Sequence, residues 1–392
     1  MPGGHGWFGT RRRWAVAAIA VGLFSLPVEA QVRARAAGVP LLGTPGPLNA
    51  ITDVSGVEVG QTTLVSGSGL LVPGHGPVRT GVTVIFPKGR AYLGSVYAGS
   101  FVLNGTGELT GRSLIEELGE FFGPVALTGT GSVGTVRDAV QAWYRRRLGG
   151  DPERLFPFSL PVVGETFDGT LNDVFGGHVH PEHVFAALDG ARPGPVEEGN
   201  VGGGTGMTAH GFKAGIGTSS RVVAVGGERY TVGVLVQANH GSRDQLTIAG
   251  VPVGRELRDP APTGRAKEGS IVVVVATDAP LLPHQLRRVA VRATHGMARV
   301  GGMSGTTSGD IFLAFSTARP TGEDAAAHQV TYLDSLALNP LFEATVLATE
   351  EAILNALFTA KTMSGINGTT VAAIPVERVQ EILKKYGRLA DR

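Results

Sequence analysis

A serine that opens a strongly apolar segment is the first candidate for chemistry in this chain. Glu268-Gly269-Ser270 ends a polar, Pro- and Gly-containing stretch and leads directly into Ile271-Val272-Val273-Val274-Val275, which has the pattern of a buried strand. If the bond between Gly269 and Ser270 were hydrolysed, Ser270 would become a new N-terminus. Its hydroxyl would be a nucleophile, and its own α-amine, with an ordinary pKa of about 7.7–8.0, could act as the general base. Because Gly-Ser before a strand is common, the pattern alone leaves this a hypothesis.

A cluster of histidines is the second candidate. His178, His180 and His183 surround Pro181-Glu182. On a strand, His178 and His180 would share a face and could hold a zinc or another divalent ion, with Glu182 as an adjacent carboxylate. Pro181-Glu182 is also typical of a helix start, which would make His180 a cap residue and the other two histidines surface residues. Both interpretations stay open at this point.

A glycine-dense segment is the third candidate. Residues 200–207 read NVGGGTGM, and the backbone N–H groups of such a segment could cradle a phosphate. The segment lacks the Gly-Lys-Ser/Thr ending of a P-loop, and it has no dinucleotide fingerprint with an acidic residue at the right distance. It is more typical of a tight turn beside a binding cleft.

The composition excludes several classes of protein. The 392 residues include 34 Lys and Arg against 33 Asp and Glu, a formal net charge of +1, so the chain has no basic footprint for nucleic acid. Hydrophobic residues make up 42% and charged residues 17%, which supplies a core and excludes disorder over most of the chain. The absence of cysteine excludes disulfide scaffolds, zinc fingers, iron–sulfur clusters and thiol catalysis.

Apolar periodicity predicts mixed helices and strands to position these residues. Strands are expected at 82–86, 270–276 and 310–316, with a hairpin of 221–225 and 230–238 around Gly226-Gly227. Helices are expected at 132–147, capped by Ser132, and at 283–300, 345–362 and 375–386. Residues 31–50 are expected to form a tail or strap, and residues 259–269 an exposed loop that feeds a buried strand. The pattern shows neither a regular βαβ rhythm nor a repeat of fixed period.

The first thirty residues have the pattern of an export signal. Arg11-Arg12-Arg13 precedes an apolar run over 14–26, and Val28-Glu29-Ala30 has the small-residue spacing that a signal peptidase recognises. The run is shorter than the ~20 residues of a membrane-spanning helix; an uncleaved anchor is the alternative. The mature chain is expected to start near Gln31, in the periplasm or outside the cell, with no membrane attachment after the signal is removed.

Several segments together resemble the L-aminopeptidase D-Ala-esterase/amidase family, which includes β-peptidyl aminopeptidases. In chain order they are LNGTGELTG (103–111), SVGTVRDA (132–139), GETFDGTLND (164–173), GNVGGGTGMTAHGFKAGIGTSSR (199–221), VQANHG (236–241), the run over 269–300 and SGDIFLAFS (308–316). These segments keep one order and span most of the mature chain. The resemblance makes self-cleavage before Ser270 the leading hypothesis.

The resemblance implies an α/β fold, namely a four-layer α/β/β/α sandwich similar to N-terminal nucleophile hydrolases but with different strand connectivity. Ornithine acetyltransferases share this fold and use a threonine nucleophile. One catalytic domain would then consist of an α chain, residues 31–269, and a β chain, residues 270–392. The resemblance also implies a homo-oligomer, often a tetramer of αβ units. It further implies that catalysis needs no metal or organic cofactor.

The resemblance also implies roles for individual residues. Ser270 would be the nucleophile, and Asn239 would donate to the oxyanion, a contact worth ~3 kcal/mol in comparable sites. Ser308 and Asp310 match a Ser-x-acid pair that would relay or orient the proton held by the Ser270 amine. Glu165 would anchor the free ammonium of the substrate.

Two positions depart from relatives. Asp310 stands where β-peptidyl members of the family carry Glu, so the acid has a shorter reach. Phe167 stands where relatives can carry tyrosine, so a hydroxyl is absent and the side chain keeps an apolar wall of the substrate site.

The sequence therefore predicts a secreted or periplasmic serine aminopeptidase or amidase. It would release N-terminal L-, D- or β-amino acids from short peptides, amides or esters through an acyl-enzyme on Ser270. The alternatives are a metal-dependent hydrolase that uses the cluster His178, His180 and His183, and a non-catalytic periplasmic binding protein. The acetyltransferase branch is a nearer rival, but an exported chain has no obvious access to acetylated ornithine.

Overall fold

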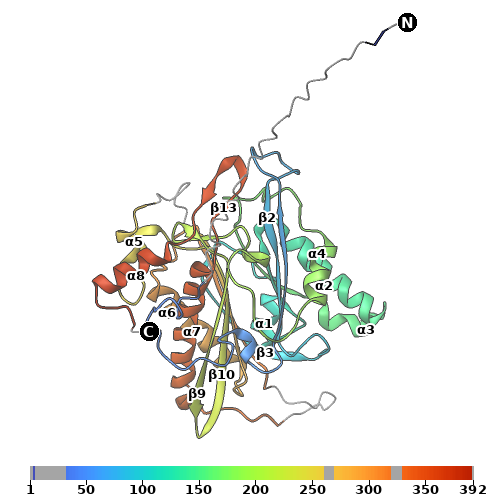
Figure 1. Ribbon diagram of the computed structural model, residues 1–392. Coiled ribbons are helices and arrows are strands. Elements are labelled where there is room, and N and C mark those ends of the chain that lie inside the picture. Colours follow the sequence, from blue (N-terminus) through green and yellow to red (C-terminus); the bar gives the residue numbers. More distant parts are fainter. Residues whose placement is uncertain (1–2, 5–31, 260–268, 319–328, 391–392) are drawn as a thin grey trace. The chain divides into compact units, whose positions relative to one another are not determined.

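The computed structural model describes residues 3–4, 32–259, 269–318 and 329–390 (Figure 1). The chain divides into the units Met1–Ala30 and Gln31–Arg392, and the fold below is that of the second unit. The expected signal over 1–30, except for Gly3 and Gly4, and most of the expected loop over 259–269 lie outside the described residues.

The larger sheet has six strands in the order β4-β3-β12-β11-β10-β9. The strands are β4 (Glu120–Phe122), β3 (Ser95–Gly105), β12 (Gly309–Ser316), β11 (Ile271–Thr277), β10 (Glu228–Ala238) and β9 (Ile216–Val225). β11 and β12 run parallel at the centre, and every other pair is antiparallel. Every residue of β11 is buried, as its continuous apolar run predicts for a central strand that is covered on both faces.

The smaller sheet has four strands in the order β1-β2-β5-β6. The strands are β1 (Glu58–Ser66), β2 (Val78–Phe86), β5 (Val125–Gly129) and β6 (Val162–Thr166). β5 and β6 are parallel, whereas β2 pairs antiparallel with both of its neighbours. Two short hairpins complete the sheets of the described residues, β7 (Thr208–Ala209) with β8 (Phe212–Lys213) and β13 (Met363–Ser364) with β14 (Thr370–Val371).

Helices cover the outer face of each sheet, as Figure 1 shows for α6 and α7 on one side and α2 and α4 on the other. The main helices are α2 (Val133–Leu148), α4 (Pro181–Asp189), α6 (Pro283–Arg299), α7 (Asn339–Phe358) and α8 (Val376–Lys385), and the short ones are α1 (Arg112–Leu118), α3 (Pro152–Leu155) and α5 (Val253–Glu256). One hydrophobic cluster joins the larger sheet to α6, α7 and α8, a second fills the space between the sheets, and a third joins the smaller sheet to α2 and α4. The expected four-layer α/β/β/α sandwich is confirmed.

The expected elements are present, with shifted ends. β9 and β10 form the predicted hairpin, and Gly226 and Gly227 turn it with φ values of 62° and 91°, which suit a tight hairpin turn. Ser132 precedes α2, but its side chain makes no capping hydrogen bond. The helix expected at 345–362 was wrong at both ends, because α7 begins at Asn339 and ends at Phe358. Its first turn contains Pro340, at a place where the missing N–H of proline costs no hydrogen bond.

Residues 32–50 form a strap that is anchored by ion pairs. Arg35 of the strap and Arg221 of β9 both donate to Glu351 of α7, at 2.7 and 2.6 Å. Arg33 pairs with Glu198 at 2.8 Å. The expected strap is therefore a fixed part of the fold.

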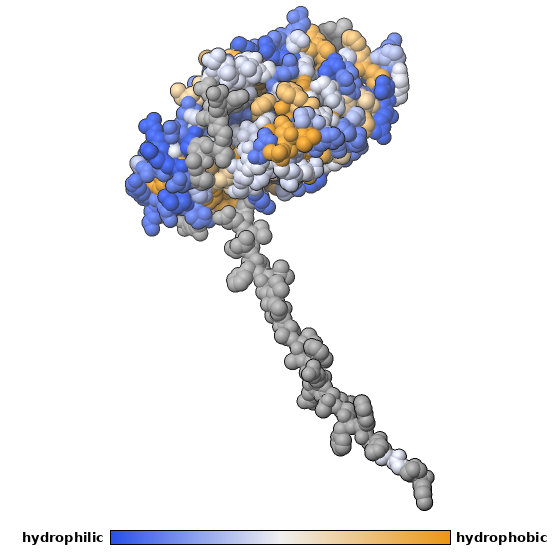
Figure 2. All heavy atoms as spheres, turned by 90° about the horizontal axis from the view of Figure 1, so that it is seen from above, coloured by the Kyte–Doolittle hydropathy of each residue, from blue (hydrophilic) through white to orange (hydrophobic). Residues whose placement is uncertain are grey.

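The surface mixes polar and apolar residues. On the face drawn in Figure 2, hydrophobic residues form small groups among hydrophilic ones. Within the described residues, no helix combines the length and the apolar content that crossing a bilayer requires.

Candidate active site

Strand register brings the predicted nucleophile and its predicted partners together at one end of the larger sheet. The antiparallel register of β10 with β11 places Asn239 opposite Ser270, and the backbone N–H of Asn239 donates to the Ser270 carbonyl at 3.0 Å. The parallel register of β11 with β12 places Gly309 beside Ser270 and Ser308 beside Gly269. The positions of these groups are thus set by backbone pairing.

The predicted nucleophile is enclosed by polar groups. Ser270 is 5% exposed, and its Oγ accepts a hydrogen bond from the backbone N–H of Gly309 at 3.0 Å. The hydroxyl of Ser308 lies within hydrogen-bonding distance of two acceptors, the Gly269 carbonyl oxygen and, at 2.7 Å, the Asp310 carboxylate. One hydroxyl has one proton, so it donates to one of these acceptors at a time. The shorter acid at 310 does reach Ser308.

Gly269 fits its position because it has no side chain. A Cβ added there would lie 1.8 Å from the carbonyl oxygen of Asn239 and 3.0 Å from its side-chain nitrogen. Any other residue would push the chain away from Asn239. Glycine therefore lets the bond before Ser270 approach both Asn239 and Ser308.

The side chain of Asn239 is held in one orientation. Its Oδ1 accepts from the backbone N–H of Thr208 at 2.9 Å, which fixes the oxygen end of the amide. Its Nδ2 donates to the carbonyl oxygen of Phe167 at 3.0 Å. Because an amide nitrogen carries two hydrogens, the second N–H is left for an oxygen that gains charge next to Gly269.

Glu165, at the end of β6, is a buried carboxylate on the smaller-sheet side of the site. It accepts from the backbone N–H of Glu108 at 3.0 Å and from the hydroxyl of Thr130. Burial raises the pKa of Glu165, and the two hydrogen bonds oppose that shift. Gly107 lies between Glu165 and Gly309, because a Cβ added at Gly107 would be 3.4 Å from the Glu165 carboxylate and 3.0 Å from Cα of Gly309.

Phe167 is two residues further along and is 41% exposed. Its ring lies over Gly169, where an added Cβ would be 2.3 Å from the ring. Phe167 therefore combines an exposed aromatic ring with the backbone carbonyl that holds Asn239.

The histidine cluster does not form a metal site. His178 hydrogen-bonds Asp173 at 2.9 Å. His180 precedes α4, as its neighbour Pro181 predicts, and its backbone N–H donates to His183 Nδ1 at 3.0 Å. Over the parts of the chain that the structure describes, no group of three or more His, Asp or Glu residues could hold a metal ion. The alternative of a metal-dependent hydrolase required these three histidines to bind one ion, and their arrangement does not allow it.

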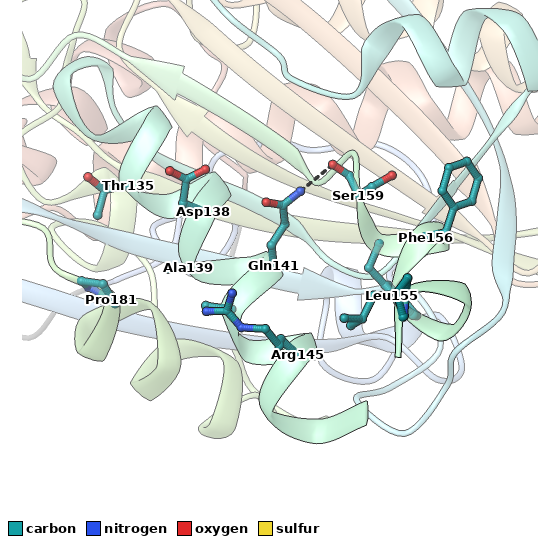
Figure 3. Close-up of a pocket in the computed structure, with 12 residues that line it drawn as sticks. Thr135, Asp138, Ala139, Gln141, Arg145, Leu155, Phe156, Ser159 and Pro181 are labelled. Carbon is teal, nitrogen blue, oxygen red and sulfur yellow. Dashed lines mark hydrogen bonds between the residues drawn. The ribbon is translucent and has the colours of Figure 1, made fainter. Parts of the chain in front are cut away.

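The glycine-dense segment is a turn inside the protein. Gly202, Gly203 and Gly204 are buried, and the backbone N–H groups of the first two donate to the hydroxyls of Thr63 and Thr83 at 2.9 and 3.1 Å. These donors are already used, so they do not cradle a phosphate. A separate hollow of about 800 Å³ between α2 and α3 (Figure 3) contains none of the predicted site residues.

Sequence reasoning missed several residues that hold the site. Thr208 and Gly309 act through backbone N–H groups, which every residue except proline offers, so residue type gives no signal. Thr130 acts through a hydroxyl on Glu165, but it lies far from Glu165 in sequence. Only the three-dimensional structure reveals these contacts.

Known relatives decide the family. The model of peptidase family S58 matches residues 49–371. This chain belongs to peptidase family S58. The β-peptidyl aminopeptidase BapA of Sphingosinicella xenopeptidilytica is 50% identical over 396 residues, which cover 96% of this chain and 98% of that protein. The BapA of Sphingosinicella microcystinivorans is 50% identical over 374 residues, which cover 91% of this chain and 93% of that protein.

Solved structures agree with this assignment of the S58 chain. The L-aminopeptidase D-Ala-esterase/amidase of Ochrobactrum anthropi, described as a prototype of the serine aminopeptidases and a variant of the Ntn hydrolase fold, has a TM-score of 0.84 at 45% identity, covering 91% of this chain and 99% of that one. A β-aminopeptidase of Burkholderia sp. has a TM-score of 0.83 at 46% identity, covering 92% and 100%. This S58 peptidase is a hydrolase of the serine aminopeptidase type.

Proposed function

We propose that this S58 peptidase cuts itself between Gly269 and Ser270, and that the new N-terminal serine then releases N-terminal residues from short peptides, aminoacyl amides or esters. The observation that carries the proposal is the contact of the Gly269 carbonyl oxygen with the Ser308 hydroxyl. This contact supplies a donor at the carbonyl of the one bond whose hydrolysis creates a free amine beside the Ser270 hydroxyl.

In the self-cleavage step, Ser270 Oγ attacks the carbonyl carbon of Gly269. The bond from that carbon to the Ser270 nitrogen breaks, the nitrogen takes up the hydroxyl proton, and Gly269 is left as an ester on Oγ. Ser308 donates to the carbonyl oxygen as it gains charge. Water then hydrolyses the ester, which gives a Gly269 carboxylate and a free Ser270 with both hydroxyl and amine.

In turnover, the Ser270 amine accepts the hydroxyl proton while Oγ attacks the substrate carbonyl. Asn239 donates its second N–H to the oxyanion, and the amine or alcohol leaves with the proton. Water releases the acyl group from Ser270. Ser308 and Asp310 orient the amine, and the carboxylate of Glu165 pairs with the ammonium of the substrate. Besides water, the steps use only groups of the protein and the substrate, and they need no metal or organic cofactor.

We propose β-amino acids at the substrate N-terminus as the first class to test. Support comes from the two relatives that are 50% identical and are named β-peptidyl aminopeptidases. An α- and a β-amino acid differ by one methylene, and such a difference is worth only ~1–3 kcal/mol in a pocket. L- and D-α-amino acids are therefore the matched comparison.

We also propose export to the periplasm or beyond, with signal removal before Gln31, and assembly of the mature αβ units into a homo-oligomer. Support for export is the arginine triplet 11–13, the apolar run 14–26 and the small-residue site 28–30. Support for assembly is the family resemblance.

The test of self-cleavage is a denaturing gel of purified protein with N-terminal sequencing of each band. Wild-type protein should give two pieces, the smaller starting Ser-Ile-Val, whereas Ser270→Ala should stay full length. Ser100→Ala is the matched control, because Ser100 is a buried serine on β3 of the same sheet. An intact chain with full aminopeptidase activity would exclude the proposal.

A further inference from the structure

The β7–β8 hairpin carries a buried charge that the proposed steps do not use. Lys213 of β8 pairs with Thr208 of β7, and its side chain is 0% exposed. Its Nζ donates to the carbonyl oxygens of Met207 and Ala214 at 2.5 and 2.6 Å, with the carbonyl of Gly204 at 3.5 Å. Burying an amine is costly, so apolar packing alone does not explain a lysine here.

The surroundings of Lys213 suit its protonated form. An ammonium has three N–H donors and no acceptor, which matches three carbonyl oxygens around Nζ. Burial lowers the pKa of Lys213 to about 7, and the nearby Asp168 opposes that shift. Asp168 is itself buried, and burial raises its pKa to about 6.

The lysine is connected to the proposed oxyanion donor through one peptide group. Met207 contributes the carbonyl of that group, which accepts from Lys213, and Thr208 contributes its N–H, which donates to Asn239 Oδ1 at 2.9 Å. Hydrogen bonds that pass through the same amide polarise one another. A positive charge at one end of this chain therefore makes the Nδ2–H of Asn239 a stronger donor at the other end.

We propose that Lys213 is a positioning residue for catalysis, which orients and polarises Asn239 through the Met207–Thr208 peptide group. This inference rests on the proposed function, because it takes Asn239 as the donor to the oxyanion. The charge of Lys213 strengthens the hydrogen bond from Asn239 to an oxyanion more than the bond to the neutral carbonyl of the bound substrate. Loss of the charge should therefore lower kcat more than it raises KM.

The hairpin has a second anchor that does not involve Lys213. Arg243 donates to the carbonyl oxygens of His210 and Gly211 at 3.1 and 2.5 Å. Its guanidinium also lies 3.4 Å from the centre of the Phe212 ring. The turn is therefore held when Lys213 is replaced, which makes a charge-removing variant a fair test.

The experiment is a double-mutant cycle of Lys213→Met and Asn239→Ala, with kcat expressed per self-cleaved chain. Lys213→Met should lower kcat roughly 5- to 20-fold and change KM by less than about twofold. In the Asn239→Ala background, it should lower kcat by less than about twofold, because the group through which it acts is gone. Lys213→Gln, which keeps hydrogen bonding but not the charge, should lie between wild type and Lys213→Met. Lys361→Met, at an exposed position, should match wild type.

The outcomes separate this inference from the proposed function. If Asn239→Ala keeps the wild-type kcat, the proposed oxyanion role fails and the inference falls with it. If Asn239→Ala is impaired while both Lys213 variants are not, only the inference fails. Equal losses from Lys213→Met in the two backgrounds would show a general structural role and overturn the inference. Should Lys213→Met fail to fold in a melting experiment, the Lys213→Gln cycle decides by the same criteria.

Discussion

The two sheets supply different kinds of group to the site. The larger sheet contributes Asn239, Ser270 and Asp310 from the adjoining ends of β10, β11 and β12. In our proposal Ser270 makes and breaks the bonds, Asn239 stabilises the oxyanion and Asp310 orients the Ser270 amine. The smaller sheet contributes Glu165 at the end of β6, with Phe167 just beyond it, and in our proposal these residues hold the substrate.

The two groups are also held differently. Strand pairing fixes the backbone of both residues, with Ser270 between β10 and β12 and Glu165 beside β5. The carboxylate that Glu165 offers to the substrate is held by side-chain contacts instead, with a hydroxyl of Thr130 and an N–H of Glu108 from other segments. Register cannot change by less than one residue, but side-chain and loop contacts can shift by small steps. If our proposal holds, reactivity depends on the backbone pairing of the larger sheet, whereas substrate choice depends on side-chain contacts of the smaller sheet that can be adjusted. Variants of site residues on the larger sheet should change kcat, and variants of site residues on the smaller sheet should change KM.

The largest effect should come from Ser270→Ala. Without the attacking oxygen, turnover of aminoacyl amides should fall at least ~10⁴-fold, as for other removed nucleophiles. The measurement is the initial rate with a chromogenic aminoacyl amide, with Ser100→Ala as the control. A residual rate within tenfold of wild type would show that the larger sheet does not carry the nucleophile.

Asn239→Ala should have the second largest effect. It removes one donor to the oxyanion, which should lower kcat about 10²–10³-fold, with KM changed less than about threefold. Steady-state kinetics over a range of substrate concentrations separate the two constants. A rise in KM with an unchanged kcat would show that Asn239 binds substrate instead of stabilising the oxyanion. It would contradict the assignment of kcat effects to the larger sheet.

Glu165→Gln should act on KM. Losing a charge-assisted contact with the substrate ammonium costs about 1.5–3 kcal/mol, or roughly a 10- to 150-fold rise in KM. Burial raises the pKa of Glu165, so the carboxylate loses its charge at a higher pH than an ordinary glutamate. The wild-type KM should therefore rise as pH falls through that pKa, and the KM of Glu165→Gln should not follow it. Equal pH dependence of KM in both proteins would count against the ammonium contact.

Phe167→Tyr should have the smallest effect. The ring is 41% exposed, so an added hydroxyl can reach water without the cost of burial. We expect kcat/KM for each substrate to change by less than about fivefold, as for other small changes to a pocket wall. The informative measurement is the ratio of kcat/KM between α- and β-aminoacyl amides. A large fall in kcat would mean that position 167 takes part in the chemistry of the larger sheet.

Sequence and structure agree unevenly across the molecule, for physical reasons. The strand after Ser270 and the hairpin around Gly226-Gly227 follow from local patterns, namely a continuous apolar run and paired glycines. The beginning of α7 was missed because apolar periodicity is weak there, although Pro340 is a local signal for a first helical turn.

The residues of the candidate site were harder to predict from local sequence patterns than the strands and helices were. The position before a buried strand made Ser270 a hypothesis, which the family resemblance made the leading one, and the roles of Asn239, Ser308 and Glu165 came only from that resemblance. The layer arrangement came from the same source, because the element pattern was compatible with two sheets without requiring them. Lys213 was not singled out, since its contacts are with backbone carbonyls that no residue type reveals.

The order of strands has a consequence for the lifetime of the cut enzyme. β11 and β12 follow the proposed cut in the chain and lie between β3 and β10, which precede it. A break before Ser270 would leave the pieces interleaved, so they would copurify under native conditions. After denaturation, the two separate chains would have to meet again, and β11 and β12 would have to insert between β3 and β10. Because this step is bimolecular, it would slow with dilution. The cut protein would then persist through a high unfolding barrier rather than through reversible equilibrium, and heat inactivation would be permanent although the precursor could fold.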